Sequence, residues 1–196
     1  MSTDLFRDTH PELARIGIKI KNIDERYRPL MRTGISIDEM IYVARRLYPL
    51  LKGSKKILDL GCGNGLITVL LHKMLGSELN AIDDWSKVSK EELMRNIQTD
   101  DAKIKLSDFK ESLGLPYSDS SFDAVYSVMF LWNLGKEIRR KVAIEVKRVL
   151  KDNGKFIIVD TFVIRSKLKR EIEDLFDLAW YGEENAFSFF MWSKNK

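Results

Sequence analysis

The chain has 196 residues, of which 44% are hydrophobic and 32% are charged, and its formal net charge is +4. This length fits one domain with a full hydrophobic core, and the composition excludes a disordered or fibrous protein. The longest uncharged stretch is too short to span a bilayer and the single cysteine cannot form an intramolecular disulfide, so we expect a cytoplasmic protein with no membrane span.

Hydrophobic periodicity predicts alternating strands and helices along most of the chain. The first predicted helix covers residues 37–52, with Ser36 as its N-cap. Further helices are predicted over 66–75, 89–97 and 166–181, and another carries apolar residues from Ile138 to Val149 and stops at the turn 152–154. Strands are predicted over 56–60, 78–82, 103–106, 122–129, 156–162 and 186–192. A further strand before the last one is missing, very short or hidden in residues 183–185.

This alternation is typical of βαβ units, because short apolar strands need covering helices on both faces. We therefore predict an α/β fold with a mostly parallel sheet and an antiparallel C-terminal strand. In such sheets ligands bind at the carboxyl ends of the strands. The residues just after each strand are accordingly the candidate site residues.

The turn after the first predicted strand carries the most specific signal. The strand ends in Asp59, and the turn contains Gly61, Cys62, Gly63, Asn64 and Gly65. Glycine permits a positive φ angle and lets a ligand approach the backbone closely. A dinucleotide site would need the spacing G-x-G-x-x-G and a helix N-terminus that favours a pyrophosphate, and neither the spacing nor the acid suits it. A carboxylate here suits a ligand that carries a cationic end and no phosphate.

The string D-L-G-C-G-N-G resembles the first motif of class I S-adenosylmethionine-dependent methyltransferases, and later segments follow that family in order. The resemblance implies a three-layer Rossmann-like fold, S-adenosyl-L-methionine as the cofactor, and residues 59 and 61–65 in its site. Asp83 ends the second strand, where the family has an acid that accepts hydrogen bonds from both ribose hydroxyls. Asp84 is a rival for this role. Trp85 either contacts the cofactor or anchors its loop in the core.

The segments after the third strand and in the fourth also resemble the family. Ser107, Asp108 and Phe109 resemble a segment in which a carboxylate receives the adenine amino group and the next residue borders the base. For Asp108, a turn or N-cap role stays open. Residues 114–125 are similar to the stretch before the fourth strand in the ubiquinone/menaquinone-biosynthesis type. Ser127 and Val128 fall where the family's backbone meets the methionine part of the cofactor.

The sequence lacks several motifs of other methyltransferase classes, and this narrows the range of possible methyl acceptors. The fourth strand is not followed by the Asn/Asp-Pro-Pro-Tyr of enzymes that methylate exocyclic amines or glutamine side chains. Cytosine C5 methylation needs a nucleophilic cysteine, and the only cysteine, Cys62, lies in the glycine turn. His10 and His72 are far apart in the chain and suggest no ligand set, so we expect no metal.

No catalytic residue is assigned. Many small-molecule relatives carry a histidine pair where this chain has Trp132-Asn133, and an asparagine can orient an acceptor but cannot take its proton. Phe130 and Trp132 either line an apolar acceptor pocket or belong to the core, and the core interpretation is preferred.

The domain division and the partner remain open at this level. We expect residues 1–36 to form an N-terminal helical lid, with residues 24–32 closing the site, and residues 37–196 to form the cofactor-binding domain. Residues 136–170 carry twelve Lys and Arg against four acidic residues, either as a basic surface or as two ordinary solvated helices. We predict a methyltransferase for a small-molecule acceptor. The alternatives are an RNA or protein methyltransferase using that basic surface, and an inactive cofactor-binding subunit.

Overall fold

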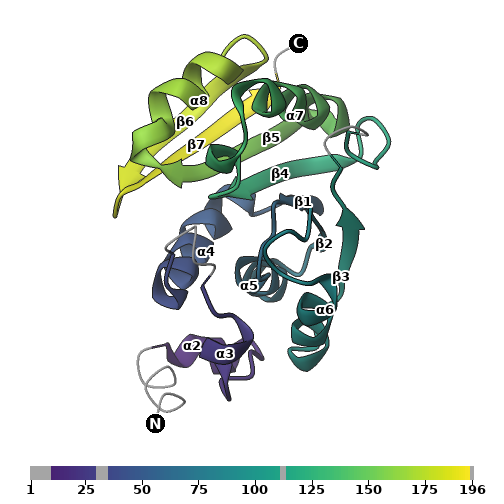
Figure 1. Cartoon of the computed structure of the whole chain (residues 1–196), viewed down its shortest axis with the longest axis vertical. Coiled ribbons are helices and arrows are strands. Elements are labelled where there is room, and N and C mark those ends of the chain that lie inside the picture. Colours follow the sequence, from purple (N-terminus) through teal and green to yellow (C-terminus); the bar gives the residue numbers. More distant parts are fainter. Residues whose placement is uncertain (1–9, 30–34, 111–113, 195–196) are drawn as a thin grey trace.

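The computed structural model describes residues 10–29, 35–110 and 114–194 (Figure 1). The helices are α2 (Pro11–Arg15), α3 (Ile23–Arg26), α4 (Ile37–Leu51), α5 (Leu66–Leu75), α6 (Lys90–Thr99), α7 (Lys136–Val149) and α8 (Arg165–Ile172), with 3-10 turns η1 (Leu131–Asn133) and η2 (Phe162–Ile164). The strands are β1 (Lys56–Leu60), β2 (Glu78–Asp83), β3 (Ile104–Asp108), β4 (Phe122–Val128), β5 (Leu150–Thr161), β6 (Phe176–Glu184) and β7 (Phe187–Lys194).

The strands form one sheet in the order β3-β2-β1-β4-β5-β7-β6. All pairings from β3 to β5 are parallel, and β7 runs antiparallel to both β5 and β6. The strand order reverses between β1 and β4, which is the place where open α/β sheets bind ligands. The predicted α/β fold with a mostly parallel sheet and an antiparallel C-terminal strand is confirmed.

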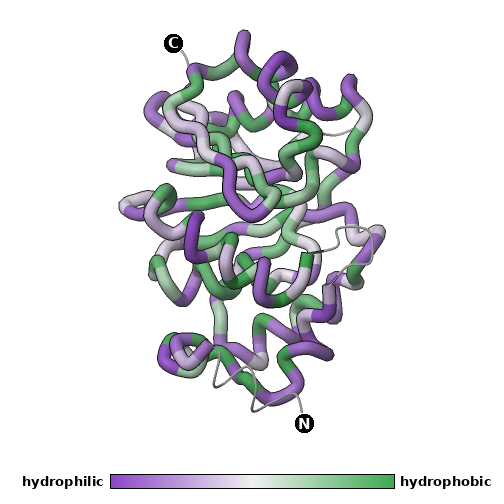
Figure 2. The backbone as a smooth tube through the Cα atoms, turned by 90° about the vertical axis from the view of Figure 1, so that its left-hand side faces the viewer, coloured by the Kyte–Doolittle hydropathy of each residue, from purple (hydrophilic) through white to green (hydrophobic). Residues whose placement is uncertain are grey.

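Helices cover both faces of the sheet (Figure 1). One face packs against α4, α5, α6 and the N-terminal helices, and the other packs against α7 and α8. Apolar residues concentrate in the strands in the middle of the molecule, while hydrophilic residues gather on the outer helices and loops (Figure 2). Ser36 caps α4 as predicted: its Oγ accepts a hydrogen bond from Glu39 N, and its own N donates to the Glu39 carboxylate. In the described part of the chain no helix is long and apolar enough to cross a membrane.

The predicted helix over residues 166–181 is wrong in its second half. The helix α8 ends at Ile172, and Phe176–Glu184 is the strand β6, so the sixth strand exists. The apolar spacing fitted a helix because β6 lies at the sheet edge and buries little more than Phe176, which leaves no clear alternation. Pairing with β7, including the Tyr181–Phe190 ring contact at 4.8 Å, outweighs the local helical pattern.

The predicted turn at residues 152–154 lies inside β5. The register jumps from Phe122↔Leu150 to Ala124↔Lys155, so extra residues of β5 bulge out of the ladder at this point. The helix α7 accordingly ends at Val149, before the turn signal.

Candidate functional site

The turn between β1 and α5 tolerates only glycine at two positions. Gly61, Gly63 and Gly65 have φ angles of +82°, +54° and +80°. A Cβ atom on Gly61 would lie 2.2 Å from Phe130 Cγ, and one on Gly65 would lie 2.1 Å from Leu93 Cδ1. The backbone N–H groups of Gly61 and Cys62 donate to Ile82 O at 2.9 and 3.3 Å, which holds the turn against β2.

Asp59 near the end of β1 is a buried carboxylate whose two oxygens differ in their hydrogen bonds. Its Oδ2 accepts hydrogen bonds from Thr68 Oγ1 at 2.5 Å and from the Tyr126 hydroxyl at 2.6 Å. Among the described residues no hydrogen bond reaches Oδ1, and Asp59 lines the cavity described below. Burial raises the pKa of Asp59 to about 7 against the pull of these two hydroxyls. A cationic ligand group beside Oδ1 would therefore favour the ionised carboxylate.

Asp83 and Asp84 lie in different surroundings. The buried Asp83 carboxylate accepts hydrogen bonds from Gly63 N at 2.8 Å, Asp84 N at 2.8 Å and Trp85 N at 3.2 Å. Burial raises the pKa of Asp83 despite these bonds. The Asp84 side chain is exposed and accepts from Ser86 N at 2.8 Å, which closes a local turn. Asp83 is thus the carboxylate tied to the glycine turn.

Trp85 ties the loop after β2 to the end of β3. Its Nε1 donates to Asp108 Oδ1 at 2.8 Å, and Lys90 Nζ lies 2.6 Å from the same oxygen. The Lys90 ammonium and the indole N–H lower the pKa of the exposed Asp108 carboxylate. The anchoring role considered for Trp85 matches this geometry, while its contact with the cofactor stays a prediction.

The remaining predicted residues are placed as follows. Ser127 is buried, and its Oγ donates to Leu60 O at 2.9 Å, so it joins β4 to β1. Phe109 is buried, and its ring meets the Phe130 ring edge-on at 5.9 Å. Ser107 is half-buried within β3.

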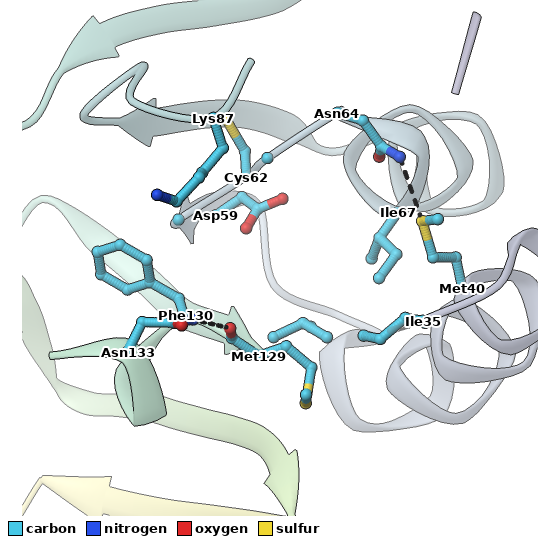
Figure 3. Close-up of a pocket in the computed structure, with 13 residues that line it drawn as sticks. Ile35, Met40, Asp59, Cys62, Asn64, Ile67, Lys87, Met129, Phe130 and Asn133 are labelled. Carbon is cyan, nitrogen blue, oxygen red and sulfur yellow. Dashed lines mark hydrogen bonds between the residues drawn. The ribbon is translucent and has the colours of Figure 1, made fainter. Parts of the chain in front are cut away.

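A cavity opens beside the glycine turn (Figure 3). It is lined by Ile35, Met40, Asp59, Gly61, Cys62, Gly63, Asn64, Ile67, Lys87, Val128, Met129, Phe130 and Asn133. Of the residues predicted to contact the cofactor, Gly65, Asp83, Asp84, Trp85, Ser107, Asp108, Phe109 and Ser127 are outside this lining. The structure therefore brings β1, the glycine turn and the end of β4 together, with β2 and β3 beside them.

Sequence reasoning missed one wall of this cavity. Ile35 and Met40 come from α4 and the segment before it, Ile67 comes from α5, and Met129 directly follows β4. Nothing in their local pattern separates them from core residues. Lys87 also lines the cavity, and its place in the loop after β2 is the one sequence feature that could have suggested this.

The two aromatic residues after β4 do not share one environment. Phe130 packs against the core and also lines the cavity above Gly61. Trp132 is 42% exposed, so the preferred assignment of Trp132 to the core is wrong. Its backbone N donates to the buried Asp160 carboxylate at 3.1 Å, which fixes the turn η1 while the indole faces outward.

The N-terminal segment is attached to the glycine turn. Asn64 Nδ2 donates to Tyr27 O at 2.9 Å and to Arg28 O at 3.1 Å, while Asn64 Oδ1 accepts from Leu66 N. The Tyr27 hydroxyl donates to the fully buried Asp100 at 2.6 Å, and Arg26 lies 2.8 Å from the same carboxylate. Residues 1–9 and 30–34 of the predicted lid lie outside the described residues.

Five of the twelve basic residues between 136 and 170 form ion pairs with carboxylates of the described residues. The ion pairs are Arg139–Glu171, Arg140–Asp174, Arg148 with Asp119 and Glu145, Lys151–Asp123 and Arg165–Glu183. The acidic C-terminal residues therefore compensate part of the local charge, and these pairs fit the interpretation as ordinary surface helices.

The two histidines take part in local contacts. His72 Nε2 accepts from Lys103 N at 3.2 Å, which joins α5 to the segment before β3. His10 lies 2.8 Å from Asp38. Within the ranges that the structure describes, no three His, Cys, Asp or Glu side chains are grouped to hold a metal ion.

Comparison with known proteins matches this chain to methyltransferases. A family model described as a methyltransferase domain matches residues 58–158. A putative methyltransferase of Encephalitozoon cuniculi is 34% identical over 105 residues, which are 52% of this chain and 43% of that protein. A sterol 4-C-methyltransferase of Caenorhabditis elegans is 31% identical over 109 residues, 53% of this chain and 30% of that protein. The chain spans less than half the length of the curated relatives it matches.

Solved structures show the same fold. A protein of Pyrococcus horikoshii superposes with a TM-score of 0.71 at 20% identity, covering 88% of this chain and 99% of that one. A SAM-dependent methyltransferase of Aquifex aeolicus superposes with a TM-score of 0.66 at 18% identity, covering 88% and 96%. The predicted three-layer Rossmann-like arrangement is thereby confirmed.

Proposed function

Because the chain belongs to the methyltransferase domain family, a class whose methyl donor is S-adenosylmethionine, we propose that it methylates a small, mainly apolar acceptor. The observation that carries this proposal is a row of carboxylates at the ends of three adjacent strands, beside a glycine turn open to a ligand. Asp83 and Asp108 end β2 and β3, and Asp59 is the penultimate residue of β1; the three strands are neighbours in the sheet. Adjacent strands lie about 4.8 Å apart, so the row spans at least about 10 Å, which suits an elongated ligand.

The residues present fit this cofactor. Asp59 lines the cavity and its Oδ1 accepts no hydrogen bond from the described residues, which suits the cationic amino-acid end, since a cation there offsets the cost of a buried charge. Asp83, tied to Gly63, suits the ribose diol. Asp108 suits the adenine amino group. These assignments to individual residues are part of the proposal.

The apolar part of the cavity lining supports an apolar acceptor. Ile35, Met40, Ile67 and Met129 supply large apolar side chains to it (Figure 3). Methionine side chains adapt to ligand shape because they are unbranched and polarizable. Large apolar side chains also stand exposed on the turns after β4 and β5, where Trp132 is 42% and Phe162 is 46% exposed.

The proposed chemistry is positional. When bound, S-adenosylmethionine supplies a methyl carbon activated by its sulfonium: an acceptor lone pair bonds to this carbon as the C–S bond breaks, and that bond's electron pair stays on sulfur. The chain's own residues hold the acceptor in line and exclude water. Asn133 lines the cavity, where its carboxamide can orient an acceptor but cannot take a proton. An acceptor that carries a proton therefore keeps it through the transfer, and the methylated product loses it to bulk water after release.

The proposal includes a roof over the site. Residues 1–36 would form the lid and residues 37–196 the cofactor-binding domain. The hydrogen bonds from Asn64 to the backbone of Tyr27 and Arg28 support this, because they hold these two residues of the N-terminal segment beside the glycine turn.

Calorimetry with S-adenosylmethionine tests the cofactor part of the proposal: no detectable binding would refute it. Incubation of the protein with methyl-labelled cofactor and fractionated cell extract tests the acceptor part. Label in the organic-extractable small-molecule fraction is expected. Label in RNA or protein would replace the acceptor class, and cofactor binding with no transfer would favour an inactive cofactor-binding subunit.

A further inference from the structure

A groove between α7 and α8 is lined by four basic side chains that form no ion pair with the described carboxylates, and by two arginines that do. It has a volume of about 890 Å³, comparable to the pockets that hold drug-sized ligands. Six basic side chains line it, together with Glu137, Glu171 and Asp174, so its lining carries a net charge of +3.

Two arginines make the floor of the groove rigid. Arg139 donates from Nε and Nη2 to both carboxylate oxygens of Glu171, at 2.6 and 3.0 Å, and both side chains are about nine-tenths buried. Arg140 pairs with Asp174 and donates to Glu171 O at 2.8 Å. These bonds join α7 to α8, so the distance between the walls is fixed before any ligand arrives.

The walls carry cations of a different kind. Lys136 and Lys141 stand on α7, and Lys167 and Arg170 stand on α8. All four side chains are exposed, and no carboxylate of the described residues lies within 4 Å of them. Five other basic residues of the stretch 136–170 form ion pairs. The basic composition of this stretch alone therefore does not explain why four unpaired cations line the same groove.

We propose that this groove binds the phosphodiester backbone of a single-stranded nucleic acid, a site separate from the cavity of the proposed methyl transfer. Four cations on opposite walls match a chain with one negative charge per nucleotide. No aromatic side chain of the described residues lines the groove, so we expect no base stacking and binding that depends on charge rather than on sequence. In the chain, Lys136 of the groove follows Asn133 of the methyl-transfer cavity by three residues.

Salt dependence sets the expected size of the effect. Each phosphate neutralised on a single strand contributes a slope of about −0.7 to the plot of log affinity against log salt, so four contacts give a slope of about −2.8. Raising KCl from 50 to 200 mM should then weaken binding by about 50-fold.

Fluorescence anisotropy with a labelled 20-nucleotide single-stranded RNA and a DNA of equal length tests the proposal on the full chain. Both should bind with similar affinity and with the slope given above. The double variant Lys141→Glu/Lys167→Glu should bind at least tenfold more weakly at 50 mM KCl, with a shallower slope. The control Lys103→Glu/Lys169→Glu makes the same charge change at exposed lysines outside the groove and should stay within about twofold of the wild type.

Three results would overturn the inference. They are no binding of either oligonucleotide at 50 mM KCl, equal losses in the groove and control variants, and equally tight binding of a poly-glutamate peptide of matched charge. Melting temperatures check that all variants are folded. None of these outcomes depends on S-adenosylmethionine binding, so the proposed function and this inference fail separately.

Discussion

The buried carboxylate of Asp59 makes cofactor affinity depend on pH. Its pKa of about 7 lies more than three units above the ordinary value of 3.8, chiefly because of burial. The cationic end of S-adenosylmethionine should bind the ionised form, so affinity should fall as pH drops below 7. For one group with this pKa, affinity at pH 5.5 should be about 25-fold lower than at pH 7.5.

The same shift acts in the opposite direction on the stability of the cofactor-free protein. A carboxyl with a raised folded pKa binds its proton more tightly when folded, so the stability that the proton confers at low pH is lost as pH rises from about 4 to about 7. Three pKa units correspond to about 4 kcal/mol. Asp59→Asn cannot ionise, and its amide oxygen can still accept from Thr68 and Tyr126.

Calorimetry and urea unfolding of the wild type and Asp59→Asn between pH 5.5 and 7.5 test both effects. The variant should bind the cofactor at least tenfold more weakly at pH 7.5, with a flatter pH profile, and should be the more stable protein without cofactor. Any pH dependence that remains would belong to Asp83, whose pKa is also raised. A variant that keeps the full wild-type pH dependence would refute this reasoning.

Four further predictions follow from single contacts. Asp83→Ala should weaken S-adenosylmethionine binding by about 1.5–3 kcal/mol in calorimetry, whereas the exposed neighbour change Asp84→Ala should have little effect; the reverse order would mean that the ribose contact is misplaced. Gly61→Ala should abolish cofactor binding and lower the melting temperature, because its Cβ would meet the Phe130 ring; wild-type binding would contradict the close packing. Tyr27→Phe should destabilise the protein to urea by about 1–3 kcal/mol, because Asp100 loses a buried donor, and unchanged unfolding would disprove this role. Ala186→Gly should stabilise it by about 1 kcal/mol, since Asn185 and Ala186 form the β6–β7 turn at φ angles of +50° and +65°; lower stability would contradict this.

The parts of the site that follow strands could be predicted from the sequence, because a strand, a turn and a helix leave their signals in consecutive residues. Asp59 and the glycine string form such a unit, and the structure places Asp59 near the C-terminal end of β1 and the string between β1 and α5. Asp83 lies at the end of β2, beside the string, because parallel neighbours end at the same edge.

The rest depends on tertiary contacts that local patterns do not encode. Met40 on α4 looks like any core residue in the sequence, and only packing turns it toward the cavity. The strand β6 carries apolar residues at helical spacing, and its pairing with β7 decides its conformation. The charge of residues 136–170 likewise looks uniform until the fold brings Glu171 and Asp174 against Arg139 and Arg140.

The position of β7 has a consequence for how the chain folds during synthesis. β6 leaves the ribosome before β7, yet its only neighbour in the sheet is β7, which lies between it and β5. Until Phe187–Lys194 is available, β5 therefore keeps an open edge, and β6 has no strand to pair with. An uncovered strand edge is a template for association with other chains. The stage between translation of β5 and translation of β7 is thus an interval in which this strand edge is open to aggregation, and in which a chaperone could protect it.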